Sequence, residues 1–248
     1  MNLYRFAYIP DFNQCIEELN NLSMHENWDY NTHPTGSYPI LVNYVNHTFE
    51  KVYNENKIEI EGDYCCFNTG LVTNNQEEIF GYFQTNRRKE TGVPFYFVGW
   101  RKSSHRDLSK FSKLAEIASY IEDPSDLIYN VSLELRTNID HIIQDNKSRF
   151  PMPFNSYSDH VLSNILSGTI EDAKRRVKRN YKTAIPQYYK GKLQLLLPLC
   201  LDNPANADLA LVIEKENGVY RASTCLTLDM AINNARLIAK PDDEWLKV

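Results

Sequence analysis

Residues 208–225 read DLALVIEKENGVYRASTC and carry the clearest structural signal in the chain. Two runs, Asp208 to Glu214 and Tyr220 to Cys225, have strand-like composition, and Glu216-Asn217-Gly218 lies between them. An Asn-Gly pair favours the tight turn between antiparallel strands, because both residues tolerate a positive φ. The stretch therefore predicts a β-hairpin, and the apolar run Leu193 to Leu201 predicts a third strand before it.

Four shorter runs in the first half are also strand-like, being rich in Ile, Tyr, Phe, Val and Cys. They are Lys57 to Ile60, Tyr64 to Phe67, Ile79 to Thr85 and Pro94 to Trp100. Asn68-Thr69-Gly70 and Thr73-Asn74-Asn75 separate two of these runs and are typical of turns. This region therefore predicts a strand meander.

Helical periodicity flanks both groups of strands. One helix is expected to begin near Asp11, and another is expected over 40–53. Helical periodicity returns between 109 and 146, with a break at Pro124, and a last helix is expected over 228–239. A helix pair, Asp159 to Ser167 and Thr169 to Thr183, is expected to hinge at Gly168. Strands and helices occur in separate groups, so the predicted class is α+β, with a mixed, largely antiparallel sheet flanked by helices.

The length of 248 residues fits one large domain or a closely joined pair. We expect a single compact domain, residues 1–248, in which both halves contribute to one sheet. The alternative is a subdivision into 1–150 and 151–248, with a boundary near Phe150–Asn155. Pro151 and Pro153 favour that boundary, because a proline stops the preceding helix and starts an extended segment.

The composition is that of a soluble globular protein, with 42% hydrophobic and 24% charged residues. The longest apolar stretch, Leu195 to Leu201, is too short to span a bilayer, and the first residues lack the apolar core of a secretory signal. The five cysteines are odd in number and show no C-x-x-C spacing, which favours a reducing compartment. We therefore predict a cytoplasmic protein without a membrane partner.

Charge is distributed unevenly along the chain. Residues 171–192 contain eight Lys or Arg and two acidic residues, a local charge of +6, whereas the whole chain carries −5. The rest of the chain therefore carries −11. A cationic segment in an acidic protein attracts an anionic ligand locally, without making the whole surface cationic.

The helix predicted after Thr169 has a narrow apolar seam and a cationic surface. The seam consists of Ile170, Ala173, Val177 and Tyr181. The cations are Lys174, Arg175, Arg176, Lys178, Arg179 and Lys182. Such a surface suits nucleic-acid phosphates, because each contact releases counterions, and Tyr181, Tyr188 and Tyr189 would stack on unpaired bases. A solvated face that balances the acidic remainder is the alternative interpretation.

A second pattern is a polar row at i, i+4, i+7 and i+11. Its members are Glu134, Asn138, His141 and Asp145. A carboxylate beside an imidazole orients the ring and raises its basicity, as general acid–base chemistry near neutral pH requires. We hypothesise that His141 is an acid/base oriented by Asp145 or Glu134, with Arg149 binding phosphate. Exposed helices also carry such rows, so a solvated row is the alternative.

Two further polar groups are weaker candidates. Asp229, Asn233 and Arg236 form a row on the closing helix that suits a ribose hydroxyl and a phosphate, or that simply makes intrahelical hydrogen bonds. Asn68 and Thr69, at a predicted strand end, suit an anion-binding nest of backbone N–H groups or a plain turn. Catalysis would require His141, Asn68 and Asp229 to converge in one cleft.

The sequence predicts neither a metal site nor a particular cofactor. The six histidines are scattered, without H-E-x-x-H spacing or a Cys/His cluster, so no metal site is predicted. A phosphate-loop motif such as G-x-x-x-x-G-K is lacking as well, and the sequence leaves any cofactor unknown.

Several phrases resemble those of a known family. They are YCCFNTGL at 64–71, HII at 141–143 with RFP at 149–151, RRVKRNY at 175–181, AIPQYY at 184–189, QLLLPL at 194–199, ADLALV at 207–212, LTLDMA at 226–231 and NARL at 234–237. The chain resembles an uncharacterised microbial family, a domain of unknown function that occurs beside OST-type helix-turn-helix and cold-shock RNA-binding modules. The resemblance covers roughly Ile40 to Leu246 and implies an RNA setting.

The leading hypothesis is an RNA- or nucleotide-handling protein, with metal-independent phosphate transfer or hydrolysis as its enzymatic form. The alternatives are a non-catalytic RNA-binding module and a small-nucleotide sensor. These readings differ in whether His141 lies in a cleft with other polar groups or whether the cationic helix alone faces the ligand.

Overall fold

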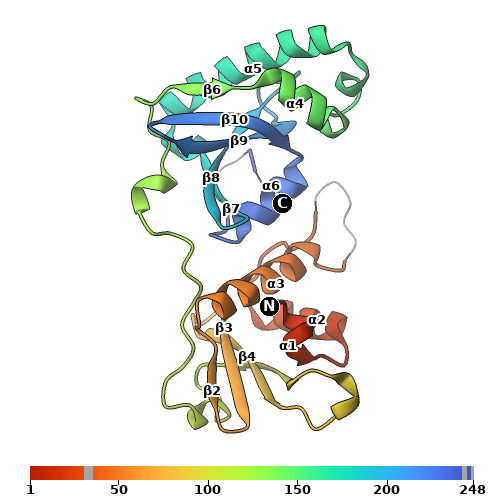
Figure 1. Cartoon of the computed structure of the whole chain (residues 1–248), viewed down its shortest axis with the longest axis vertical. Coiled ribbons are helices and arrows are strands. Elements are labelled where there is room, and N and C mark those ends of the chain that lie inside the picture. The colour runs from red at the N-terminus through yellow and green to blue at the C-terminus, as the bar shows by residue number, and fades with distance from the viewer. Residues whose placement is uncertain (31–35, 242–244, 247–248) are drawn as a thin grey trace. The chain divides into compact units, whose positions relative to one another are not determined.

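The computed structural model describes residues 1–30, 36–241 and 245–246 (Figure 1). It divides into two compact units, residues 1–119 and 120–248. Within the described residues, each unit contains one five-stranded sheet, so the chain has two sheets where one was expected. Residues 135–137 join the strands after Pro151 in the second sheet, so both sides of the expected boundary do contribute to one sheet. The boundary expected at Phe150–Asn155 lies inside the second unit. The α+β class is confirmed, because both sheets are mixed, largely antiparallel and packed against helices.

The sheet of the first unit has the order β1-β5-β4-β3-β2. Its strands are β1 (Ala7–Tyr8), β2 (Glu59–Glu61), β3 (Tyr64–Val72), β4 (Glu78–Thr85) and β5 (Phe95–Lys102). Only β1 and β5 pair in parallel; the other neighbours are antiparallel, as a meander requires. The helices are α1 (Leu3–Phe6), α2 (Phe12–Leu22) and α3 (Pro39–Asn54). Buried aromatic side chains, among them Phe49, Phe67 and Phe83, join α3 to the sheet.

The predicted turn at Asn68-Thr69-Gly70 is instead an irregularity within β3, where the register with β4 shifts. Side chains replace the hydrogen bonds that the ladder loses there. Asn68 Oδ1 accepts from Gly70 N (2.9 Å), and Thr69 Oγ1 accepts from Leu71 N (3.1 Å) and donates to Ile79 O (2.6 Å). Gly70 adopts a φ of 71°, which favours glycine. The polar cluster thus continues the strand rather than ending it.

The helices expected between 109 and Pro124 do not form. This part contains only the 3₁₀ turns η2 (Leu108–Lys110) and η3 (Pro124–Leu127). Phe111 and Ala115 are buried against the sheet, and side chains from the sheet and a neighbouring loop hydrogen-bond the segment's carbonyls. Asn68 Nδ2 donates to Ala115 O (3.3 Å), and Lys57 Nζ donates to Ile117 O (2.9 Å). These tertiary hydrogen bonds satisfy backbone groups that a helix would satisfy internally.

The sheet of the second unit has the order β6-β10-β9-β8-β7. Its strands are β6 (Leu135–Thr137), β7 (Ile185–Tyr189), β8 (Lys192–Leu199), β9 (Leu209–Glu216) and β10 (Val219–Leu226). The predicted hairpin is confirmed: Glu216 pairs with Val219, and Asn217 and Gly218 both have positive φ, 48° and 78°. That geometry belongs to the turn type whose twist matches the flanking strands.

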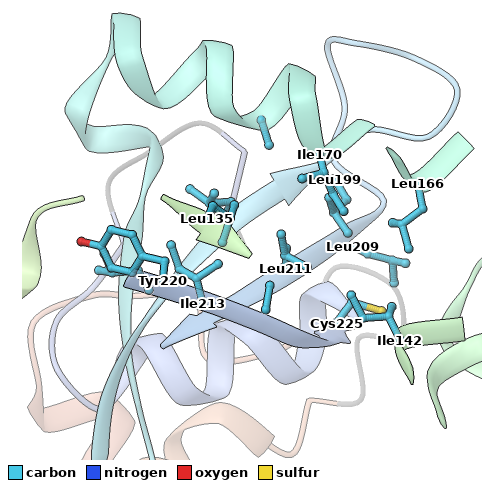
Figure 2. Close-up of a cluster of buried hydrophobic side chains, with 14 of the residues drawn as sticks. Leu135, Ile142, Leu166, Ile170, Leu199, Leu209, Leu211, Ile213, Tyr220 and Cys225 are labelled. Carbon is cyan, nitrogen blue, oxygen red and sulfur yellow. The ribbon is translucent and has the colours of Figure 1, made fainter. Parts of the chain in front are cut away.

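Three helices pack on this sheet: α4 (Ile139–Asn146), α5 (Asp159–Arg179) and α6 (Leu228–Arg236). In Figure 1, α4 and α5 lie over one face and α6 lies over the other. Figure 2 shows the core beneath α4 and α5, where Leu166 and Ile170 lie toward Leu199 and Leu209, and Ile142 lies beside Cys225. The expected linker at 150–155 therefore joins two helices that share one core.

The helix α5 differs from the predicted helix pair in two ways. It is continuous through Gly168, so the expected hinge does not occur, and it ends at Arg179 rather than Thr183. Asn180 is extended and its side chain accepts a hydrogen bond from Lys182 N (3.1 Å), which starts the 3₁₀ turn η6 (Tyr181–Thr183). An Asn at this position competes for backbone donors and so favours the end of the helix.

Candidate functional site

The helix α5 carries five of the eight Lys and Arg residues of the cationic segment 171–192. Ile170, Ala173 and Val177 are buried against the sheet, as the apolar seam predicted. Tyr181, the fourth residue of that seam, is 62% exposed, because the helix ends before it. The buried seam therefore directs the cations toward solvent, whereas Tyr181 lies outside the core.

The cations of α5 fall into two groups. Lys174 pairs with Glu171 (2.6 Å) and Arg175 pairs with Asp172 within the helix, and Arg176 donates to Pro204 O. The hydrogen bond from Lys174 lowers the pKa of Glu171. Exposed intrahelical pairs of this kind contribute little to stability, about 0.3–0.5 kcal/mol. They also pair two of the six predicted phosphate-binding cations with carboxylates.

The second group lies at the C-terminal end of α5. Lys178 and Arg179 are exposed and make no ion pair with any described residue. Lys182 follows in η6 and is also exposed. Cations in the last turn complement the helix dipole, which is worth roughly 0.3–1 kcal/mol at an exposed site. That contribution does not neutralise their charge, so Lys178 and Arg179 remain available to an anionic ligand.

The row around His141 is only partly helical. Asn138 caps α4, accepting from His141 N (3.2 Å), and His141 Nε2 lies 3.4 Å from Asp145 Oδ2. Both side chains of this pair are about half exposed. Glu134 lies before β6 instead of on the helix, and pairs with Arg136 (2.8 Å). The structure thus joins His141 to Asp145, whereas Glu134 lies outside the helix that carries them.

Arg149 is tied to the sheet. Its guanidinium donates to Cys225 O and to Thr224 Oγ1 (3.3 Å). Asn146 reinforces this junction, accepting from Cys225 N and from Thr224 Oγ1 (both 2.7 Å). The interactions described for Arg149 are therefore those of a residue that joins the turn after α4 to β10. Phosphate binding by Arg149 stays a prediction.

The two weaker candidates lie in different units. Asn68 and Thr69 are buried in the first unit, where their side chains hydrogen-bond neighbouring strands and the 111–119 segment. Asp229, Asn233 and Arg236 are half-buried on α6 in the second unit, and each interacts with other residues. Convergence of Asn68 with His141 and Asp229 stays a prediction.

A hollow that the sequence did not reveal lies at the start of α4, with a volume of about 650 Å³. Arg136 and Arg221 line it from β6 and β10, where they are direct cross-strand partners. Three carboxylates, Asp140, Glu214 and Glu216, line it as well, so the lining is not cationic overall. The alternation of exposed and buried residues predicts that Arg136 and Arg221 point outward, but only the tertiary pairing of β6 with β10 brings them together.

Two global features bear on the class of site. Among the residues that the structure describes, no three His, Cys, Asp or Glu side chains gather closely enough to hold a metal ion. None of the helices in the described part of the chain combines the length and apolar composition needed to cross a membrane.

Fold and site together define an α+β protein of two units, the second of which exposes a cationic helix end beside an exposed tyrosine. The chain belongs to the family described as a domain of unknown function, DUF3825, whose family model matches residues 19–245. No curated protein and no solved structure matches it significantly.

Proposed function

We propose that this protein binds single-stranded RNA through the C-terminal end of α5 and the turn η6. The observation that carries the proposal is that Lys178 and Arg179 are exposed and make no ion pair within the part of the chain that the structure describes, next to exposed Tyr181 and Lys182. Unpaired cations release counterions when they meet phosphates, and an exposed aromatic ring adds a surface on which a base stacks. The resemblance to a domain that occurs beside RNA-binding modules points to the same setting.

A cytoplasmic location is part of this proposal. In its support, all five cysteines are free thiols, and burial raises the pKa of the Cys66 and Cys225 thiols to about 12. Buried thiols of this kind are inert and need no disulfide partner.

The test is a comparison of two charge-matched double variants. K178E/R179E reverses the unpaired cations, whereas R136E/R221E makes the same change of charge at the hollow beside α4. Arg136 and Arg221 alternate with Leu135 and Tyr220, which are buried in the core under α5, so they lie on the other face of the sheet.

Binding is measured by fluorescence anisotropy with a labelled twelve-nucleotide RNA between 50 and 200 mM salt. We expect K178E/R179E to weaken binding at least about tenfold at the lowest salt. The slope of log K against log salt should fall by roughly 1.4, at about 0.7 per lost phosphate contact. R136E/R221E should bind as the unmodified protein does. If R136E/R221E weakens binding and K178E/R179E does not, the RNA site is the hollow beside α4 instead. If a mononucleotide binds as tightly as the twelve-nucleotide RNA, the protein is a small-nucleotide sensor.

Phosphate transfer or hydrolysis is a second candidate function, favoured by the 3.4 Å contact between His141 and Asp145. In this form of the hypothesis, the carboxylate orients the imidazole that moves the proton. The ligand-binding proposal does not depend on it, and a substitution at His141 separates the two.

A further inference from the structure

We infer that one unpaired base of the bound RNA lies in a depression beside η6, where Tyr181 provides the stacking surface. This inference rests on the proposed function and names how the same site recognises its ligand. The depression has a volume of about 210 Å³ and is lined by parts of η3, η6, β7, α6 and the segment after α6. The lining residues that matter here are Ile128, Tyr181, Lys182, Pro186 and Lys240.

The size of the depression restricts its occupant. Pockets that enclose drug-sized ligands measure roughly 300–1,000 Å³, so a space of about 210 Å³ accepts one small ring system rather than a folded ligand. Two large side chains that line the depression are exposed to solvent: Tyr181 is 62% exposed and Ile128 is 50% exposed. Exposed apolar surface within a charged region marks a binding site more often than an isolated apolar residue does.

The charge of the rim favours a nucleotide. Among the described residues that line the depression, the only charged side chains are Lys182 and Lys240, and both are cationic. The cationic rim of the depression contrasts with the lining of the hollow beside α4, which includes three carboxylates. Asp242, Asp243 and Glu244 follow in the sequence and lie outside the described residues. With Lys178 and Arg179 one turn before Tyr181, a base in the depression would leave its flanking phosphates beside lysine and arginine side chains.

The turn that carries Tyr181 is held in place before any ligand binds. Asn180 accepts from Lys182 N (3.1 Å), and Trp245 Nε1 donates to Thr183 O (2.9 Å). A stacking surface fixed in this way loses little conformational entropy on binding. Tyr189, which the sequence also offered as a stacking residue, is 47% exposed at the other end of β7 but does not line the depression, so it is not part of this base site. It therefore serves as a matched control.

The experiment compares a twelve-nucleotide RNA with an abasic phosphodiester of the same length and charge, both labelled for anisotropy. We expect the unmodified protein to prefer the RNA at least about fivefold, the lower end of what one base stacked on an aromatic side chain contributes. Tyr181→Ala should reduce that preference to less than about twofold, whereas Tyr189→Ala should keep it. K178E/R179E should weaken both ligands alike and leave the preference intact. Circular dichroism checks that each variant is folded.

The outcomes separate the inference from the function on which it rests. If neither ligand binds, the proposed function and the inference both fail. If both bind equally well, or if Tyr181→Ala keeps the preference, RNA binding stands and the base site is overturned. As a second measurement, RNA containing 4-thiouridine should cross-link under ultraviolet light to the peptide that contains Tyr181; cross-links confined to other peptides overturn the site. A poly-glutamate peptide is used as a competitor of the labelled RNA. If it competes equally well with the unmodified protein and with Tyr181→Ala, this surface binds an acidic protein, and the base site is overturned.

Discussion

Asn146 illustrates how single polar residues hold the second unit together. It is 3% exposed, and its side-chain oxygen accepts hydrogen bonds from the backbone and from the side chain of neighbouring β10 residues, Cys225 N and Thr224 Oγ1. Arg149 adds donors to the same two residues. A buried polar group left without these partners costs about 1–3 kcal/mol, so Asn146 stabilises the second unit. His141 lies about one turn earlier on α4 and is half exposed, so truncating its side chain does not leave a buried polar group without a partner.

At the residue scale, we predict that His141→Ala separates binding from catalysis. RNA affinity should stay unchanged, and the free energy of unfolding should fall by less than about 1 kcal/mol, because an exposed ion pair contributes little. If His141 is the acid/base of the enzymatic hypothesis, turnover should fall about 10²–10⁴-fold. Chromatography of RNA, nucleotides and cyclic phosphates measures the turnover, and urea unfolding measures the stability.

Asp145→Asn is the companion variant for this prediction. It keeps the shape of the side chain and removes the carboxylate that lies 3.4 Å from the imidazole, so any turnover that needs an oriented imidazole should fall. Equal rates for the unmodified protein and His141→Ala, or no turnover with any substrate, would remove the catalytic role.

At the element scale, α5 combines a structural face with an exposed one. Its buried residues recur at helical spacing, and its exposed cations near the C-terminus complement the helix dipole. The weak point is Gly168, near the middle of the helix, where glycine costs about 1 kcal/mol relative to alanine. A Cβ at this position would meet nothing within 4 Å.

We therefore predict that Gly168→Ala stabilises the protein by about 0.5–1 kcal/mol, measured as a higher urea midpoint at unchanged slope. RNA affinity should not change, because the substitution leaves the end of α5 intact. A lower midpoint would contradict the continuous helix and support a hinge at this glycine. Gly81→Ala provides the contrast, since its Cβ would lie 2.2 Å from the buried Phe67 ring and should destabilise the protein.

At the scale of the whole molecule, the chain consists of two units, each with its own sheet and buried core. Units of 119 and 129 residues are of ordinary domain size. The predicted RNA-binding residues at the end of α5 and the depression beside η6 both belong to the second unit. The first unit contributes none of them.

This arrangement predicts that residues 120–248, expressed alone, fold and keep the RNA affinity of the full chain within about threefold. Cooperative urea unfolding followed by circular dichroism tests the folding, and anisotropy at matched salt tests the affinity. Residues 1–119 should fold as well but bind RNA weakly. A fragment 120–248 that is folded yet fails to bind would show that the first unit supplies part of the interface.

Local chemistry in the sequence determined much of the second unit. The Asn217-Gly218 turn, the strands on either side of it and the buried seam of α5 follow from turn preference and from apolar spacing, which act over a few residues. The tertiary structure decided the rest. Residues 111–119 form no helix, and side chains from elsewhere in the first unit hydrogen-bond the carbonyls of Ala115 and Ile117. Tyr181 is exposed because α5 ends before it, at Arg179. Arg136 and Arg221 meet because β6 pairs with β10, a contact between residues 85 positions apart. Periodicity within one segment carries no information on such long-range pairings, since they depend on which surfaces bury one another.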